Sequence, residues 1–184
     1  DWVEGVMEGQ GSFFYKNGDI YEGEWVNNIK EGEGTYAYAD GKTYQGSFIR
    51  NKEEGLGTLT HTDGKRYNGY WLNGKLNGEG TFFDLNGNSY EGNWKDNLYD
   101  GKGTFKYANR DIYEGLFVNG KRNGKGTFKY KTNDLYKGDW VEGVMEGQGS
   151  FFYKNGDIYE GEWVNNIKEG EGTYAYADGK TYQG

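Results

Sequence analysis

Hydrophobic and polar residues alternate along this chain in short runs, and the runs recur every 23 residues. Each cycle has one alternating, aromatic-rich run, such as residues 67–72, and a second at residues 77–84, with Asn, Gly and Asp around them. Such alternation between turn residues predicts β-strands joined as hairpins. No window shows the three-and-four spacing of an amphipathic helix, and the 34 glycines disfavour one. The pattern therefore predicts an all-β chain.

A strict repeat underlies this pattern. Position 1 of the 23-residue repeat is the Tyr found at 21, 44, 67, 90, 113, 136, 159 and 182. Positions 3, 12 and 14 are Gly in all eight copies, and position 5 is Trp or Phe. A period of this length predicts a repeat architecture in which each unit packs on its neighbours, so residues 1–184 are interpreted as one continuous array. Residues 139–184 are identical to 1–46, and both ends cut a predicted strand, which indicates an excerpt of a longer array or an engineered chain.

The spacing also predicts how the strands pair. A four-residue loop at positions 7–10 would place position 5 opposite 12, position 3 opposite 14 and position 1 opposite 16. Rings and glycines would then share one face, with each Trp ring over bare glycine backbone. A three-residue loop at positions 19–21 would end in a left-handed residue, usually Gly. Asn133 can adopt that conformation, whereas Arg110 cannot easily, so the loop at Arg110 is expected to differ.

The predicted fold is a single-layer, twisted antiparallel β-meander of tandem β-hairpins, an open and solenoid-like sheet of about 16 strands without a deep core. The mean hydropathy of −1.04 would suit a disordered chain, but 18% of the residues are aromatic and they recur at fixed positions. Cysteine is absent, so disulfides and thiolate metal sites are excluded. No apolar run approaches the roughly 20 residues that span a bilayer.

Nothing in the sequence predicts catalysis, a metal site or a cofactor. His61 is the only histidine and has no cysteine or second histidine to act with. The carboxylates recur as a solvated periodic set, and the Asp/Asn/Gly loops lack the spaced acids and distal Glu of a calcium-binding EF-hand. The chain is therefore interpreted as a non-enzyme.

Two sets of residues are candidates for binding. The first is the aromatic residue at position 18, at a strand end, where a ring with a polar tip suits an interface: Tyr15, Tyr38, Tyr107, Tyr130, Tyr153 and Tyr176. The second lies in the segment 102–137, which has nine bases and three acids although the whole chain carries −8. Its candidates for an acidic protein segment or an anionic lipid, predicted to share the polar face, are Lys102, Lys106, Lys125 and Lys129. A solvated charged face is the simpler explanation of this lysine set. The net charge disfavours nucleic acid.

The sequences YEGEW at 21–25 and GEGTY at 32–36 resemble the MORN (membrane occupation and recognition nexus) repeat, and the resemblance covers the whole chain. It implies an elongated single-layer sheet that acts as a scaffold or docking surface, inside the cell, in cytoskeletal, ciliary or membrane-associated assemblies. The family often has His at position 11, where this chain has acids or Asn, which weakens the expectation of phospholipid binding.

The first hypothesis is thus a structural scaffold for protein–protein interaction, docking a helix or an extended segment along the aromatic face, with self-association through strand edges as a further possibility. The alternative is a membrane-tethering module that binds anionic phospholipid through residues 102–137. A third is an appendage that positions an enzyme encoded outside this sequence.

Overall fold

The structure is a computed structural model that describes residues 2–3 and 5–184, with side chains from Gly5 onward. The chain divides into two compact units, residues 1–85 with 94–97 and residues 86–93 with 98–184. The strands of the first unit are β1 (Trp2–Val3), β2 (Val6–Met7), β3 (Gly9–Phe14), β4 (Ile20–Val26), β5 (Ile29–Ala37), β6 (Thr43–Ile49), β7 (Lys52–Thr60), β8 (Arg66–Leu72) and β9 (Lys75–Phe83). β10 (Ser89–Lys95) has residues in both units. The second unit contains β11 (Leu98–Lys106), β12 (Ile112–Val118), β13 (Lys121–Lys129), β14 (Leu135–Val141), β15 (Val144–Phe152), β16 (Ile158–Val164), β17 (Ile167–Ala175) and β18 (Thr181–Gln183).

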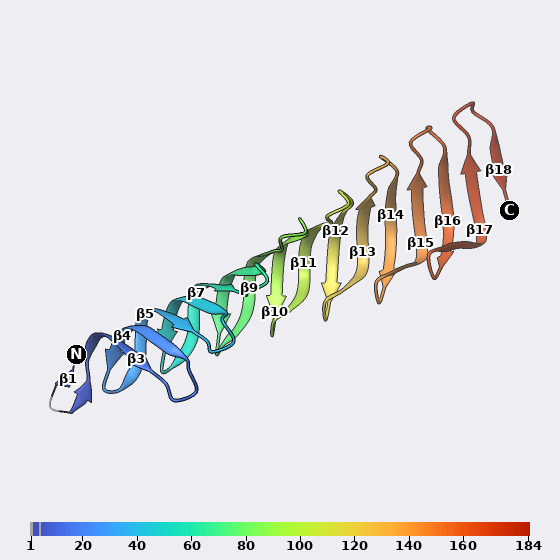
Figure 1. Cartoon of the computed structure of the whole chain (residues 1–184). Coiled ribbons are helices and arrows are strands. Elements are labelled where there is room, and N and C mark those ends of the chain that lie inside the picture. The colour runs from blue at the N-terminus through green and yellow to red at the C-terminus, as the bar shows by residue number, and fades with distance from the viewer. Residues whose placement is uncertain (1, 4) are drawn as a thin grey trace. The chain divides into compact units, whose positions relative to one another are not determined.

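The described residues form an all-β meander, as the sequence predicts. β3 to β18 follow one another in a 16-stranded order, and β1 and β2 pair separately with each other. The pairs whose register is determined are all antiparallel, and each strand runs beside its chain neighbours (Figure 1). β3 and β18 stand at the two ends of the order, so the sheet is open and does not close into a barrel. In strands such as β4, buried and exposed residues alternate perfectly, which gives one aromatic face and one polar face.

The predicted four-residue loop at positions 7–10 is wrong. β4 ends at Val26 and β5 begins at Ile29, so the turn has two residues, Asn27 and Asn28, with φ of 51° and 64°. Two successive residues with positive φ make a type I′ turn, which matches the twist of the flanking strands. The strand register then shifts after Gly23, opposite the left-handed Gly32 (φ 63°), which forms a bulge.

Because of this bulge, one predicted pairing within the hairpin is wrong and the others are confirmed. Within its own hairpin Trp25 lies opposite Lys30 at position 10, not opposite Gly32. Gly32 instead pairs with Phe48 of the following repeat, so position 5 does face position 12 across the next strand boundary. The pairings of position 1 with 16 and of position 3 with 14 are confirmed, as in Tyr21 with Tyr36.

The three-residue loop at positions 19–21 is confirmed. The Tyr38 amide donates to the Lys42 carbonyl at 2.9 Å, and Gly41, with φ of 86°, donates to the Tyr38 carbonyl at 2.8 Å. Asn133 adopts the same conformation with φ of 73°. The expectation that the loop differs at Arg110 is wrong, because Arg110 has φ of 75° and donates to the Tyr107 carbonyl at 2.8 Å. The turn geometry outweighs a local cost of about 1–2 kcal/mol.

The core is a row of position-1 tyrosines packed on glycine. Tyr21 is fully buried, and a Cβ added to Gly34 would lie 2.6 Å from the Tyr21 ring, so only glycine fits beneath it. The Tyr21 hydroxyl donates to the Glu24 carbonyl at 3.1 Å, beside the register shift. Trp25 covers the neighbouring strand and donates through Nε1 to the Gly11 carbonyl at 3.1 Å. Tyrosine, more than the predicted tryptophan, is therefore the ring that covers the glycine pair.

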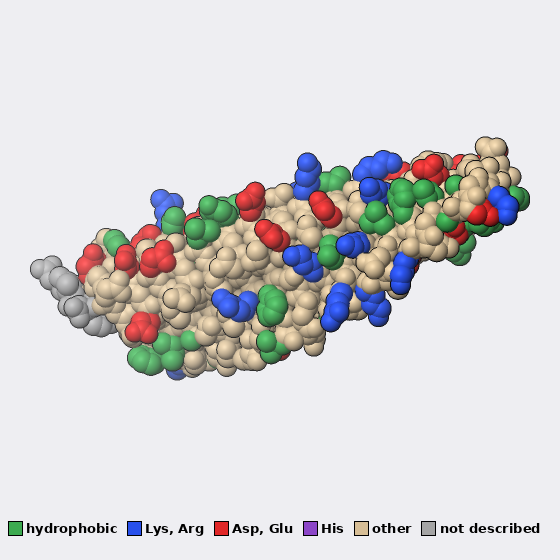
Figure 2. Space-filling view, turned by 90° about the horizontal axis from the view of Figure 1, so that it is seen from above, with side chains coloured by type: hydrophobic (Ala, Val, Ile, Leu, Met, Phe, Trp, Pro, Cys, Tyr) green, Lys and Arg blue, Asp and Glu red, His purple; other side chains and the backbone are tan. Residues whose placement is uncertain are grey.

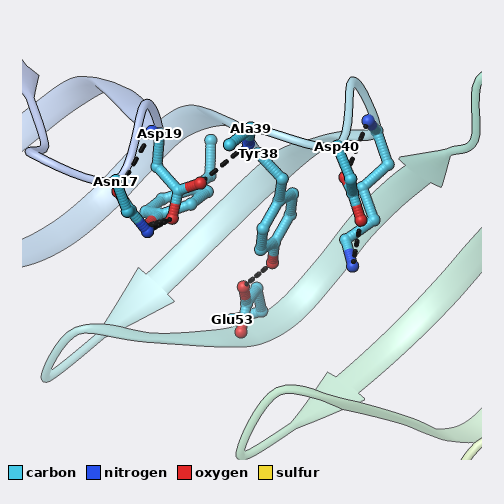
Figure 3. Close-up of polar contacts among 8 residues, drawn as sticks. Asn17, Asp19, Tyr38, Ala39, Asp40 and Glu53 are labelled. Carbon is cyan, nitrogen blue, oxygen red and sulfur yellow. Dashed lines mark hydrogen bonds and ion pairs between the residues drawn. The ribbon is translucent and has the colours of Figure 1, made fainter.

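Neighbouring repeats are joined at their turns. The Asn28 amide donates to the Met7 carbonyl at 3.1 Å, and the Asn27 amide donates to the Glu8 carboxylate at 2.9 Å. At the other end of the hairpin, Asp19 accepts from the Ala39 amide at 2.7 Å (Figure 3). The acids at position 11 therefore act as acceptors for the following turn. The Met7 amide in turn donates to Asn28 Oδ1 at 2.9 Å, so neighbouring repeats exchange hydrogen bonds in both directions.

Candidate docking surface

The position-18 tyrosines pack into a continuous row of rings with the aromatic residues at position 16. In the second unit, ring centroids lie 4.5 Å apart for Phe105 and Tyr107, 5.8 Å for Tyr107 and Phe128, and 4.6 Å for Phe128 and Tyr130. Alternating separations of 5.6, 4.6, 5.8 and 4.7 Å continue the series to its end. We call this surface the ring row; it consists of Phe105, Tyr107, Phe128, Tyr130, Phe151, Tyr153, Tyr174 and Tyr176.

The candidate tyrosines of the second unit are thus joined in one row of rings, whereas the sequence predicted only that each lies at a strand end. Tyr107, Tyr130 and Tyr153 are half-buried, and Tyr176 is 47% exposed. Each tyrosine therefore has one side on a neighbouring ring and another side open to a ligand.

The first unit has a shorter version of the row. Phe13, Tyr15, Tyr36 and Tyr38 follow one another at 4.8, 5.7 and 4.6 Å. The next two position-18 residues differ, because His61 packs edge-on against Tyr67 at 5.6 Å and Asp84 is buried. These two residues therefore leave the ring series that Tyr15 and Tyr38 belong to.

The side chain at position 10 is the part of this face that the sequence prediction missed. Because the position 7–8 turn is short, position 10 lies in a strand, directly opposite Trp or Phe of its own hairpin. It takes six different residue types in eight repeats, being in chain order Met7, Lys30, Glu53, Leu76, Tyr99, Arg122, Met145 and Lys168. Position 1 is always Tyr and position 5 is always Trp or Phe, whereas position 10 varies between charged, aromatic and aliphatic residues.

Two of these residues place positive charge on the rings of the second unit. The Arg122 guanidinium lies 4.2 Å from the Trp140 ring centroid and 5.2 Å from that of Phe128. Lys168 Nζ lies 4.4 Å from the Tyr159 centroid and 4.8 Å from that of Tyr153. Both side chains are half-buried, and within the described part of the chain neither forms an ion pair with a carboxylate.

The position-10 residues Lys30 and Glu53 of the first unit already contact aromatic side chains of that unit. Lys30 is buried, with Nζ 4.2 Å from the Tyr36 centroid, and this burial lowers its pKa. Glu53 accepts a 2.5 Å hydrogen bond from the Tyr38 hydroxyl, as Figure 3 shows. Burial, followed by that hydrogen bond, raises the pKa of Tyr38.

The four candidate lysines lie on the opposite, polar face of the second unit, and all four are exposed. Lys125 pairs with Asp139 at 2.7 Å, and nearby Lys121 pairs with Glu142. In the view of Figure 2, basic side chains (blue) and acidic side chains (red) both occur among tan and green atoms. Binding of anionic lipid or of an acidic segment by this set stays a prediction.

The family-model comparison matches every part of the array, at residues 1–20, 21–43, 44–66, 67–89, 90–112, 113–135, 136–158 and 159–181, and the model is that of the MORN repeat. The chain belongs to the MORN repeat family. From residue 21 onward the matched segments begin at the position-1 tyrosines, so the MORN unit and the structural repeat coincide. No curated protein matches this MORN array significantly.

Several solved structures share the fold. The TCP10 domain of Danio rerio CPAP is 11% identical, with a TM-score of 0.55 over 100% of this chain and 86% of that chain. The TCP domain of Drosophila melanogaster SAS-4 (dCPAP), solved in complex with a proline-rich motif of Ana2 (dSTIL), is 10% identical, with a TM-score of 0.52 over 95% and 88%. A CPAP G-box domain gives 9% identity and a TM-score of 0.52 over 96% and 98%. At these identities the likeness shows the fold alone.

The described part of the MORN array contains no group of three or more His, Cys, Asp or Glu side chains that could hold a metal ion. It also has no helix with the length and apolar character needed to cross a membrane. The arrangement is that of a repeat scaffold whose distinctive chemistry lies on its aromatic face.

Proposed function

We propose that this MORN array is a non-catalytic scaffold that docks an extended segment of a partner protein along the ring row. The observation that carries the proposal is the unbroken series of rings, at 4.5–5.8 Å, from Phe105 to Tyr176. Partly exposed tyrosines supply large contact area with few rotatable bonds and often dominate binding energy. The row crosses several strands, so it suits a ligand that lies across the sheet.

The fold relatives support a peptide ligand and a cytoskeletal setting. The SAS-4 domain was solved with a proline-rich motif, and a role in centriole elongation has been suggested for the CPAP G-box domain. These statements concern those proteins. For this chain they favour an extended segment over a helix, and an intracellular assembly of the cytoskeleton or a cilium as the setting.

Site-specific photo-crosslinking tests the proposal. A benzoylphenylalanine residue replaces Tyr130 on the aromatic face or, as the matched control, the adjacent Lys129, whose exposed side chain lies on the polar face. Both proteins are irradiated in extracts of the source cells, and crosslinked peptides are sequenced. We expect a discrete partner segment from position 130 that is absent from position 129. The same products at both positions, or products from 129 alone, would overturn the proposal.

A further inference from the structure

The spacing of the MORN repeats matches one regular peptide conformation. Equivalent positions in successive repeats lie two strands apart, about 9.5 Å. A polyproline II helix rises about 9.3 Å per turn of three residues, so it presents the same side at each repeat. An α-helix advances about 9.5 Å in roughly 1.8 turns, and its contact side would rotate away. A β-strand covers the distance in about three residues, and its side chains would point alternately toward and away from the sheet.

The chemistry of the ring row suits the same conformation. Proline-rich segments dock on aromatic-lined surfaces because the rings cover the pyrrolidine faces, and their backbone is preorganised. Such a segment has no internal hydrogen bonds, so its carbonyls need donors. Tyr107, Tyr130 and Tyr176 in the row each carry a hydroxyl that can donate.

Position 10 adds charge to this surface. Arg122 and Lys168 occupy the same position two repeats apart, about 19 Å, with Met145 between them. Arg122 donates from Nη2 to the Gly143 carbonyl at 2.5 Å, and Lys168 donates to the Tyr153 hydroxyl, so each keeps donors for another acceptor. Six residues of polyproline II also span about 19 Å.

The first unit is a poor site for such an acidic segment. The position-10 residue that follows Lys30 is the acid Glu53. An acidic segment laid along that unit would meet a like charge one repeat beyond Lys30.

We infer that the occupant of the second unit is an acidic, proline-rich segment in the polyproline II conformation, lying across the strands with three residues per repeat. Its carboxylates lie six residues apart, one against Arg122 and one against Lys168, with an apolar residue midway between them. This inference rests on the proposed function, and it adds the class of partner and the residues that set its register.

Synthetic peptides test the register with the whole chain. The probe is fluorescein-labelled PPEPPLPPEPPP, and PPEPPLPEPPPP has the same composition with its glutamates one residue too close. A third peptide, PPQPPLPPQPPP, removes the charge. Fluorescence anisotropy is expected to show the first peptide binding about tenfold more tightly than either of the others. Equal affinity for the first two peptides would overturn the register.

Charge reversal tests the residues. The double variant Arg122→Glu, Lys168→Glu is expected to lose at least about tenfold in affinity for the first peptide. The matched control Lys125→Glu, Lys129→Glu makes the same change in net charge on the opposite face and is expected to change affinity by less than about twofold. The milder pair Arg122→Gln, Lys168→Met gives the comparison if the reversed variant unfolds.

An equal loss in the control would show general charge attraction and overturn the assignment. Absence of peptide binding would also overturn it, while a partner crosslinked from position 130 would leave the proposed scaffold function intact.

Discussion

The Tyr136 hydroxyl offers the sharpest test of what stabilises the aromatic face. Tyr136 is fully buried, and its Oη donates to the Asp139 carbonyl at 3.0 Å. The register of β14 and β15 shifts between Gly138 and Trp140, so this bond supplies a donor where the ladder is interrupted. Tyr136→Phe keeps the ring on its glycines and removes only the donor. Leaving a partly buried carbonyl without this partner is expected to lower the free energy of unfolding by about 1–2 kcal/mol.

Two measurements follow the effect. In urea denaturation, a slope of about 2–3 kcal/mol per M converts that loss into a midpoint lower by roughly 0.5 M. Because repeat arrays unfold in local steps, hydrogen exchange should also show faster exchange in β14 and β15 than in β11.

Tyr176→Phe is the matched control, since it removes a hydroxyl from an exposed ring. Its free energy of unfolding is expected to stay within about 0.5 kcal/mol of the wild-type value. If Tyr136→Phe unfolds at the wild-type urea concentration and exchanges no faster in β14, the hydroxyl does not hold the bulge together and the argument fails.

Two substitutions and one pH series probe the paired glycines, the buried tyrosines and the hydrogen bonds between neighbouring repeats. Gly126→Ala would place a Cβ 2.5 Å from Tyr113 Oη and is expected to cost about 1–3 kcal/mol in urea denaturation; a stable variant would contradict the packing. Burial raises the pKa of both Tyr21 and Tyr113 from 10.0 to about 12, so above pH 10 the folded state retains protons that the unfolded state releases. The urea midpoint should therefore fall as pH rises from about 10 to 12, and a rise would refute the sign. Asp134→Ala removes the acceptor of the Lys154 amide, which it binds at 2.8 Å. The Lys154 amide should then exchange faster, and the free energy of unfolding should fall by about 1 kcal/mol. An unchanged exchange rate would show that this hydrogen bond between repeats does not form in solution.

Much of the fold follows from spacing because the invariant residues depend on one another. A ring as large as Tyr21 can lie on the sheet only where Gly23 and Gly34 leave bare backbone, so the three recur together and fix the strand pairing. The position 7–8 turn was harder to predict. It requires two residues with positive φ, and in some copies these include Arg50 or Glu142, which seldom adopt that conformation.

The candidate surface was predictable only in part, because the two-residue turn at positions 7–8 determines where position 10 lies. Position 18 attracts attention because tyrosine recurs there, whereas position 10 has no recurring chemistry. The usable signal was Asn-Gly at residues 73–74 and 119–120, a strong mark of a two-residue hairpin turn. A two-residue turn at these sites places position 10 in the strand, opposite Trp71 or Phe117, and therefore on the aromatic face.

The hydrogen bonds between successive turns also bear on how the array is built during synthesis. They run in both directions, since the Asn28 amide binds the Met7 carbonyl and the Met7 amide binds Asn28 Oδ1, and their partners lie only 19–21 residues apart. On the ribosome the earlier hairpin emerges first, so each new hairpin needs only the hairpin before it to complete these bonds. Translation can therefore lay down this sheet one hairpin at a time, without waiting for any distant part of the chain.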